Sequence, residues 1–310
     1  MKRYHWLICL SLIFLAFGCA SVPEPPAKQH LTILYFGDLE GHLAAHPTAD
    51  GRTLGGVARL ASLIEQVRSQ NDRRNVPTLL FYTGGCLSGS PINEKFRGKA
   101  TVRILNQLEI AGTVVAPADL RYGRKYFDEL VKEAKFPWIV SNLRGKRNAN
   151  PWLPLGFARI LPNGLIFGVV GVTSPAVLTH CSESEAYNLA VDTETLPTKV
   201  AAARTGSRDG VNVILSQCGP ECDEQLAVDI PGTDVIIAPG ESMTKTELTG
   251  GITRVTSGVR GEHLGRLDIE GFGRTILILR HKIYDITPDL PEDRITKSLE
   301  NGYLNRLKNN

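Results

Sequence analysis

The 310-residue sequence has little net charge and no run of basic residues. Its formal net charge is +3 at pH 7, and Lys and Arg do not cluster with interleaved aromatic residues. Nucleic-acid-binding proteins carry such a basic surface, so nucleic acid is not expected as a partner. Internal repeats and low-complexity blocks are also lacking. With 42% hydrophobic residues, the chain can bury a large core, as one large domain or two small ones.

Long apolar stretches are scarce, and the clearest one, from Leu7 to Phe17, is too short to span a membrane. It follows Lys2 and Arg3 and precedes small residues, which is the pattern of a secretory signal. The string LAFGC resembles a bacterial lipobox, in which Cys19 becomes the lipidated first residue of the mature protein. The alternative is an ordinary signal peptide that is cleaved near Ala20.

These features predict the organisation of the chain and its location. Residues 1–18 are expected to be a lipoprotein signal peptide, and the Pro-rich residues 19–29 a tether. The folded body is expected at 30–285, followed by a helical or frayed tail at 286–310. The residue after Cys19 is not one that retains lipoproteins in the inner membrane. We therefore expect a lipid anchor in the outer membrane of a bacterial cell envelope, facing the periplasm, with the membrane as a partner.

The body alternates between apolar runs and segments with helical spacing. Helices are expected at 55–70, 95–108, 124–134 and 193–206. Strands are expected at 31–37, 78–82, 112–115, 137–141, 166–172, 211–216 and 234–238, and antiparallel strands at 253–257, 264–270 and 275–284. This pattern predicts a layered α/β sandwich with mixed sheets. Ligands bind outside the carboxyl ends of strands in open α/β sheets, so the loops after five of the strands are expected to share one cleft.

Several segments, in the right order, resemble the N-terminal catalytic domain of UshA-like 5'-nucleotidases, within the calcineurin-like metallophosphoesterases. They read LTILYFGDLEGHL, LGGVARLASLIEQVR, LLFYTGGCLSGSPI, GVNVILSQCGPECDEQ and VTSGVRGEHLGRLDIE. The resemblance implies a four-layer α/β/β/α sandwich over residues 30–285, with a two-metal site that hydrolyses phosphoesters. The family's second domain, which recognises the nucleoside, is not expected within 310 residues, so a nucleotide substrate is not expected either.

Carried across residue by residue, the family's metal-binding motifs keep one ligand, Asp38. Its other ligand positions are occupied by Glu40, Gly85, Pro117, Gln217 and either Glu241 with Met243 or Gly240 with Ser242, and its catalytic His by Ala118. Gly and Pro side chains offer no donor atom, and the Met thioether is too soft for Mg²⁺ or Mn²⁺. The resemblance therefore implies the fold without ordinary two-metal phosphatase activity.

Cysteines stand beside the lost metal ligands. Cys86 follows the position of the bridging Asp, and Cys218 and Cys222 follow that of a metal-binding His. They are the candidate catalytic residues, and at least two of the three are expected within bonding distance. With Cys181 they could form two disulfides, in any of three connectivities. A structural disulfide, a redox pair and a soft-metal site remain alternatives.

Other polar residues have weaker signals. His42 is either a ligand or a residue that shapes its turn, and Asp119 is expected to be a solvated loop residue. His263 and Arg266 are expected on the surface of a strand.

Three functions follow. The first is a non-hydrolysing lipoprotein that acts through a cysteine-containing cleft or binds a small molecule or protein. The second is a thiol redox or soft-metal protein on the same scaffold. The third is a still-active phosphoesterase with a rearranged metal site. In that third case, Asp38, Glu40 and Glu241 would bind a divalent metal, and the cofactor is otherwise undetermined.

Overall fold

The computed structural model describes residues 27–87, 89–146, 151–181, 189–192, 210–273 and 275–309. The predicted signal peptide, the predicted lipidation site Cys19 and the helix predicted at 193–206 lie outside the described residues. The folded body and the C-terminal segment are both within them, apart from the gaps between these ranges.

The first of two six-stranded sheets contains both ends of the folded body. Its order is β16-β15-β1-β4-β5-β6, with β1 parallel to β4 and antiparallel to β15. The strands are β1 (Gln29–Phe36), β4 (Thr78–Tyr82), β5 (Gly112–Val114), β6 (Trp138–Ile139), β15 (His263–Phe272) and β16 (Thr275–Asp285). This sheet is therefore mixed, as the sequence predicted.

The second sheet has the order β13-β14-β12-β11-β9-β8, and β11 is parallel to both of its neighbours. Its strands are β8 (Gly156–Ile160), β9 (Ile166–Thr173), β11 (Val211–Gln217), β12 (Val235–Ala238), β13 (Lys245–Glu247) and β14 (Thr253–Thr256). Two small ribbons add β2 (Ala45–Pro47) with β3 (Thr53–Gly55), and β7 (Leu143–Gly145) with β10 (Leu189–Val191).

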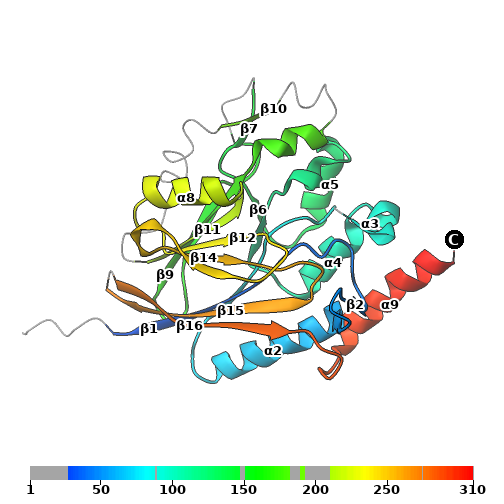
Figure 1. Ribbon diagram of the computed structural model, residues 1–310, viewed down its shortest axis with the longest axis horizontal. Helices are drawn as coiled ribbons and strands as arrows, with labels where there is room; N and C mark the ends of the chain where they lie inside the picture. Colours follow the sequence, from blue (N-terminus) through cyan, green and yellow to red (C-terminus); the bar gives the residue numbers. More distant parts are fainter. Residues whose placement is uncertain are drawn as a thin grey trace, which may run out of the picture.

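The two sheets pack face to face, and helices cover their outer faces (Figure 1). Alternate residues of each strand, such as Leu31 and Ile33 of β1, form the core between the sheets. Leu34 and Phe36 face the helices on the other side. These helices are α2 (Val57–Asp72), α3 (Pro91–Phe96), α4 (Lys99–Gln107), α5 (Arg124–Glu133) and α9 (Arg294–Lys308), whereas α8 (Pro220–Asp229) covers the second sheet. The predicted four-layer α/β/β/α sandwich is confirmed.

Two predicted helices differ from the structure. The helix expected at 95–108 is divided into α3 and α4, because Arg97 and Gly98 both have positive φ angles, of 47° and 81°. Helix α8 was not predicted, since its first turn contains Pro220 and two acids and its apolar residues are weakly periodic. Short 3-10 turns follow three strands, at Pro117–Leu120, Pro175–His180 and Thr249–Gly251.

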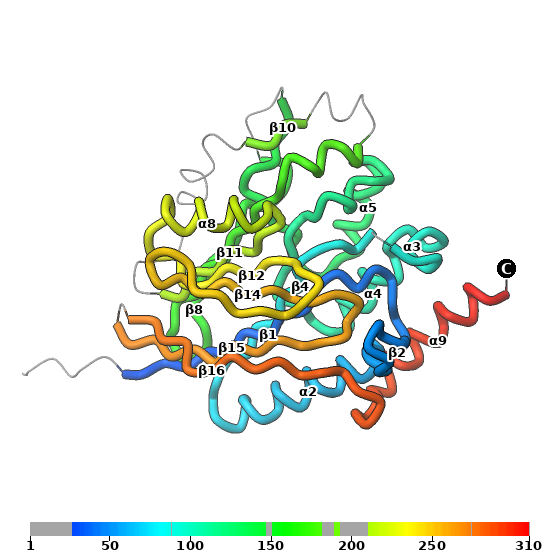
Figure 2. The backbone as a smooth tube through the Cα atoms, in the orientation of Figure 1, coloured from blue at the N-terminus to red at the C-terminus, as the bar shows by residue number. Residues whose placement is uncertain are grey.

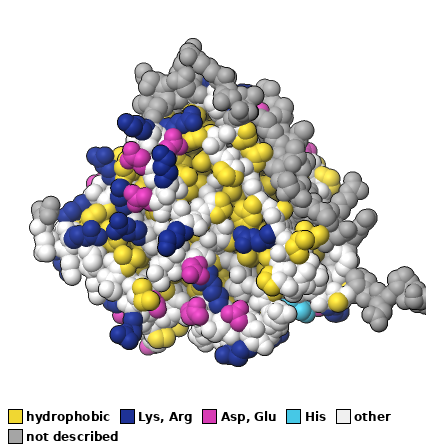
Figure 3. Space-filling view, turned by 180° about the vertical axis from the view of Figure 1, so that it is seen from behind, with side chains coloured by type: hydrophobic (Ala, Val, Ile, Leu, Met, Phe, Trp, Pro, Cys, Tyr) yellow, Lys and Arg dark blue, Asp and Glu magenta, His cyan; other side chains and the backbone are white. Residues whose placement is uncertain are grey.

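The C-terminal segment packs against the body. Helix α9 returns beside α2 and also contacts α3 and α4, as the backbone trace shows (Figure 2). Lys and Arg side chains are mixed with Asp and Glu on the face seen from behind (Figure 3). No helix within the described segments is both long and apolar enough to cross a bilayer.

Candidate functional site

The carboxyl ends of the parallel strands from both sheets meet at one end of the sandwich. Thr83, after β4, forms a hydrogen bond of 2.8 Å with Ser257, after β14. Gln217, at the end of β11, donates a hydrogen bond from Nε2 to the carbonyl oxygen of Thr83. The backbone N–H of Arg260 donates to the carbonyl oxygen of Asp38 over 2.7 Å. The ends of β1, β4, β11 and β14 therefore lie together, joined by direct hydrogen bonds.

The close approach of Thr83 and Ser257 to the end of β1 requires glycine at residue 37. A Cβ atom on Gly37 would overlap with the hydroxyl oxygens of Thr83 and Ser257. The hydrogen bond between those two side chains therefore fills the space beside the strand end. Gln217, the residue at the position of a family histidine, is used for contact between the two sheets.

The carboxylate of Asp38 lies where a side chain on Gly85 would be. The Oδ1 atom of Asp38 lies 2.5 Å from the position that a Cβ atom on Gly85 would take. Gly85 also has a φ of 85°, which disfavours any other residue there. The bridging carboxylate of the family could thus not be accommodated at residue 85 without moving Asp38 or the loop.

The three predicted metal ligands do not come together as a metal site. The Glu40 carboxylate accepts a 2.8 Å hydrogen bond from Nε of Arg260, whose positive charge balances that of the carboxylate. Glu241 is exposed in the loop after β12. Among the residues that the structure describes, no group of three or more His, Cys, Asp or Glu side chains could hold a metal ion. The residues present do not fit the two-metal centre of the family.

Asp119 is not the solvated loop residue that the sequence predicted. Its side chain is only 1% exposed, and it accepts hydrogen bonds from the backbone N–H groups of Ala116 (2.9 Å) and Leu87 (3.3 Å). Burial raises the pKa of its carboxyl to about 7, although these hydrogen bonds oppose the shift. Asp119 therefore holds the loops after β4 and β5 together.

Cys86 is fully buried in the apolar cluster beneath the helices. Burial raises the pKa of its thiol well above the ordinary range, and the nearby carboxylates of Asp119 and Asp38 act in the same direction. A thiol protonated in this way is a poor nucleophile. Of the three candidate cysteines, Cys86 is therefore the least suited to exchange with a partner.

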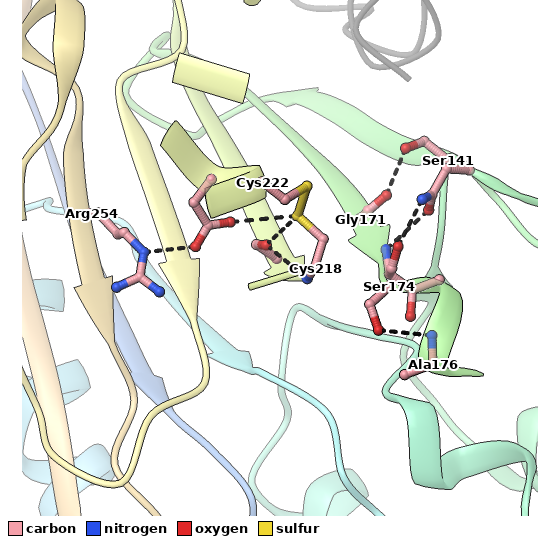
Figure 4. The surroundings of a disulfide bond; sticks show 11 residues. Ser141, Gly171, Ser174, Ala176, Cys218, Cys222 and Arg254 are labelled. Atoms are coloured by element: carbon pink, nitrogen blue, oxygen red, sulfur yellow. Dashed lines mark hydrogen bonds and ion pairs between the residues drawn. A yellow bond between two sulfur atoms is a disulfide. The ribbon is translucent and has the colours of Figure 1, made fainter. Parts of the chain in front are cut away.

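Cys218 and Cys222 form a disulfide, with 5.8 Å between their Cα atoms. The expectation that two of the three thiols lie within bonding distance is confirmed for this pair, and Cys86 and Cys181 keep their thiols. Gly219, with a φ of 101°, and Pro220 at the first position of α8 form the turn between them. The disulfide joins the end of β11 to the first turn of α8 (Figure 4). Both of its residues are partly exposed.

A buried ion pair lies directly beside the disulfide. Asp223 is 0% exposed, its Oδ1 lies 3.7 Å from Sγ of Cys218, and its Oδ2 accepts a 2.7 Å hydrogen bond from Nε of Arg254 (Figure 4). Burial raises the pKa of the Asp223 carboxyl, while Ser216 and Arg254 lower it. The hydroxyl of Ser216 is also 3.4 Å from Sγ of Cys218. Asp223 and Arg254 were not among the predicted site residues, because the contact joins α8 to β14, 31 residues away.

His42 faces another histidine. The ring centroids of His42 and His46 are 4.7 Å apart, and burial, followed by the charge of His46, lowers the pKa of His42. His46 is also hydrogen-bonded to Glu262 at 2.9 Å. This arrangement fits a residue that shapes the turn after β1.

Comparison with known proteins supports the resemblance. The chain is 27% identical to human 5'-nucleotidase over 247 residues, which is 75% of this chain and 41% of that protein. Two solved structures match the fold over most of the chain. Sulfate thiohydrolase SoxB of Thermus thermophilus has a TM-score of 0.80 and 21% identity, covering 92% of this chain and 62% of its own. Calcineurin-like phosphoesterase YfkN of Bacillus subtilis has a TM-score of 0.70 and 21% identity, covering 91% of this chain and all of its own.

The chain has the fold of a 5'-nucleotidase-like metallophosphoesterase. It spans about two fifths of the length of the curated 5'-nucleotidases that it matches. A comparison with models of protein families finds none that matches the chain. The predicted resemblance and fold class are both confirmed, whereas the predicted roles of individual residues are not tested by these similarities.

Proposed function

We propose that this metallophosphoesterase-like chain does not hydrolyse phosphoesters with two metals, and that it acts through thiol–disulfide exchange at Cys218 and Cys222. The observation that carries the proposal is the position of this partly exposed disulfide beside the buried carboxyl of Asp223. It lies next to Gln217, at the loop where the resemblance places a metal-binding histidine. The co-reactant would be a partner protein or small molecule with two neighbouring thiols.

In the reductive direction, a thiolate of the partner attacks Sγ of Cys222. The Cys218–Cys222 bond breaks, a mixed disulfide forms at Cys222, and Cys218 leaves as a thiolate. The Ser216 hydroxyl, 3.4 Å away, stabilises that thiolate by donating a hydrogen bond. The partner thiolate therefore attacks Cys222 and not Cys218, because the hydrogen bond from Ser216 makes Cys218 the better leaving group.

Asp223 passes to Cys218 the proton that the partner thiol loses when it becomes the attacking thiolate. In the oxidised protein its carboxylate is paired with Arg254 and lies 3.7 Å from Sγ of Cys218, and burial raises its pKa, which favours uptake of that proton. The second thiolate of the partner then attacks the partner's own sulfur in the mixed disulfide. This forms the partner disulfide and releases Cys222 as a thiolate at the N-terminus of α8, whose dipole favours negative charge. Two electrons pass from the partner dithiol to the chain.

We further propose that the protein works in the bacterial envelope, anchored through lipidated Cys19 to the outer membrane. The string LAFGC and the Pro-rich segment after it support this location. Disulfides persist in such oxidising compartments, whereas the cytosol keeps thiols reduced. The partner would therefore be exported as well.

The proposal is tested with the mature chain by two assays on the same preparation. The first follows exchange with a small dithiol and its oxidised form, comparing the wild type with Cys218→Ser, Cys222→Ser and the control Cys181→Ser. The second measures hydrolysis of AMP and of an aryl phosphate diester with added Mn²⁺. We expect the wild type and Cys181→Ser to exchange with the dithiol, and Cys218→Ser and Cys222→Ser to lose this exchange. We expect none of these proteins to hydrolyse either substrate. Brisk hydrolysis that Asp38→Ala abolishes would contradict the proposal, and so would exchange unaffected by either loop variant.

A further inference from the structure

A small cavity on the outer face of the first sheet carries an excess of positive charge. Its volume is about 170 Å³, and its lining residues come from the start of β1, the end of α2 and the segment after it, and strands β15 and β16. The cavity is therefore at the opposite end of β1 from Asp38. Its charged lining residues are Arg74, Arg266, Arg280 and Asp268, with His30 beside them.

The pattern of the strands explains why polar residues lie here. Thr32 of β1 is paired with Asp268 of β15, which is paired in turn with Arg280 of β16. On this face of the sheet, apolar residues further along β1 are covered by α2, but that helix ends at Asp72. Asn71, in its last turn, accepts a 3.4 Å hydrogen bond from Arg266.

Arg266 is not the surface residue that the sequence predicted. Its side chain is only 8% exposed, and its Nε donates a 2.8 Å hydrogen bond to Asp268. The Asp268 carboxylate also accepts from the Thr32 hydroxyl at 2.8 Å and lies 3.7 Å from Nε of Arg280. A single carboxylate is thus shared by a buried and an exposed guanidinium.

The lining consequently has an uncompensated charge. Three arginines face one aspartate, which leaves a net charge of +2 on these four side chains. Arg266 is only 8% exposed, whereas Arg280 is 61% exposed and Arg74 also faces solvent, so the buried guanidinium carries the charge that water screens least. Arginine forks also match the oxygens of phosphate and sulfate in geometry.

We propose that this cavity binds a small tetrahedral oxyanion, phosphate or sulfate. With a volume of about 170 Å³, the cavity has room for such an ion. The anion would lie between Arg74 and Arg280, above Arg266, and would compete with Asp268 for their donors. The site is separate from the disulfide, so it stands or falls independently of the proposed exchange activity.

The test is calorimetric titration of the mature chain with inorganic phosphate and, separately, with sulfate at constant ionic strength. We expect one saturable site. The double variant Arg74→Gln/Arg280→Gln should bind at least tenfold more weakly, while Arg103→Gln, an exposed arginine on α4, should bind within twofold of the wild type. Asp268→Asn should bind more tightly, because it removes the competing carboxylate. Circular dichroism checks that each variant is folded.

Three results would overturn the proposal. They are the lack of saturable binding to the wild type, equal weakening by Arg103→Gln, and weaker binding by a folded Asp268→Asn. A second arm uses vesicles of neutral lipid with and without phosphatidic acid. Vesicle binding that inorganic phosphate does not displace, with no binding of free phosphate, would assign the charge to a lipid surface instead of the cavity.

Discussion

The carboxylate of Asp38 lies against Gly85, with Oδ1 only 2.5 Å from the place where a Cβ atom on Gly85 would be. The resemblance assigns these two positions to the first and the bridging carboxylates of a two-metal centre. In that assignment the first acid is present and the second is absent, and Asp38 lies in the space that a side chain at residue 85 would take. Any side chain at residue 85 would therefore have to displace Asp38 or the loop.

Gly85→Asp should destabilise the protein and should not create phosphatase activity. The new Cβ atom would meet Asp38, and the positive φ of 85° adds strain, so we expect a loss of about 2–4 kcal/mol in the free energy of unfolding. Gly51→Asp is the matched control, because its φ is 82° but nothing lies within 4 Å of its Cβ position. Chemical denaturation measures both variants. Equal losses would show that the contact with Asp38 has no effect.

Asp119 should make stability depend on pH between about pH 4 and pH 7. Its pKa of about 7 in the folded protein lies above the ordinary value of 3.8, so the folded state favours the protonated carboxyl. The contribution of Asp119 is fully present below about pH 4 and is lost as pH rises through 7, at up to about 1.4 kcal/mol per unit.

Asp119→Asn should remove this slope when unfolding is measured at several pH values. It should also destabilise the protein by about 1–3 kcal/mol at low pH, because an amide cannot accept from both backbone N–H groups. Asp293→Asn is the control of opposite sign. Hydrogen bonds with Thr296 lower the pKa of Asp293, so its contribution is present above about pH 4 and is lost below. An unchanged slope in Asp119→Asn would contradict the assignment.

Asp223→Asn should slow exchange at Cys218 by at least tenfold, since general acid–base catalysis commonly contributes about 100-fold or more. The pH dependence of the rate is the decisive measurement, because losing the Arg254 contact alone would not remove a titrating group. We expect the limb of the pH profile that belongs to Asp223 to disappear. Asp229→Asn, at the exposed end of the same helix, is the control. A profile unchanged in shape would rule out proton transfer by Asp223.

Cys19 should carry lipid. Cells fed a labelled fatty acid should incorporate it into the wild type and not into Cys19→Ser, which should accumulate as an uncleaved or soluble form. Equal labelling of both proteins, or labelling of neither, would contradict the lipobox prediction. Membrane fractionation of the same cells tests the outer-membrane location.

The fold was predictable wherever apolar runs end at glycine or polar residues. The bounds of β4 and β9 agree with the sequence within one residue, because each strand is buried on both faces and reads as a continuous apolar run. The division of the 95–108 helix was not predictable from periodicity, since apolar residues continue across Arg97 and Gly98. Helix α8 was missed because its N-terminal turn resembles a loop.

The site was predictable only where contacts are local. Cys218 and Cys222 are four residues apart, so the sequence could anticipate their proximity. The burial of Asp119 and Arg266 depends on segments far away in the chain, such as Leu87 for the first and Asn71 for the second. The contact between Asp223 and Arg254 could not be predicted either, because an ion pair between residues far apart in the chain leaves no pattern in a single sequence.

The redox titration of the Cys218–Cys222 pair in the mature protein tests the central claim most directly. The protein is equilibrated in defined thiol–disulfide buffers, and the fraction of oxidised pair is counted by mass spectrometry after alkylation. Inert structural disulfides have midpoint potentials below about −300 mV. The pair is partly exposed, and in the proposed mechanism the reduced form is stabilised by protonation of Cys218 and by the α8 dipole at Cys222. We therefore predict a midpoint above that value and reversible exchange. A midpoint well below it, or a disulfide that is reduced only on unfolding, would contradict the account.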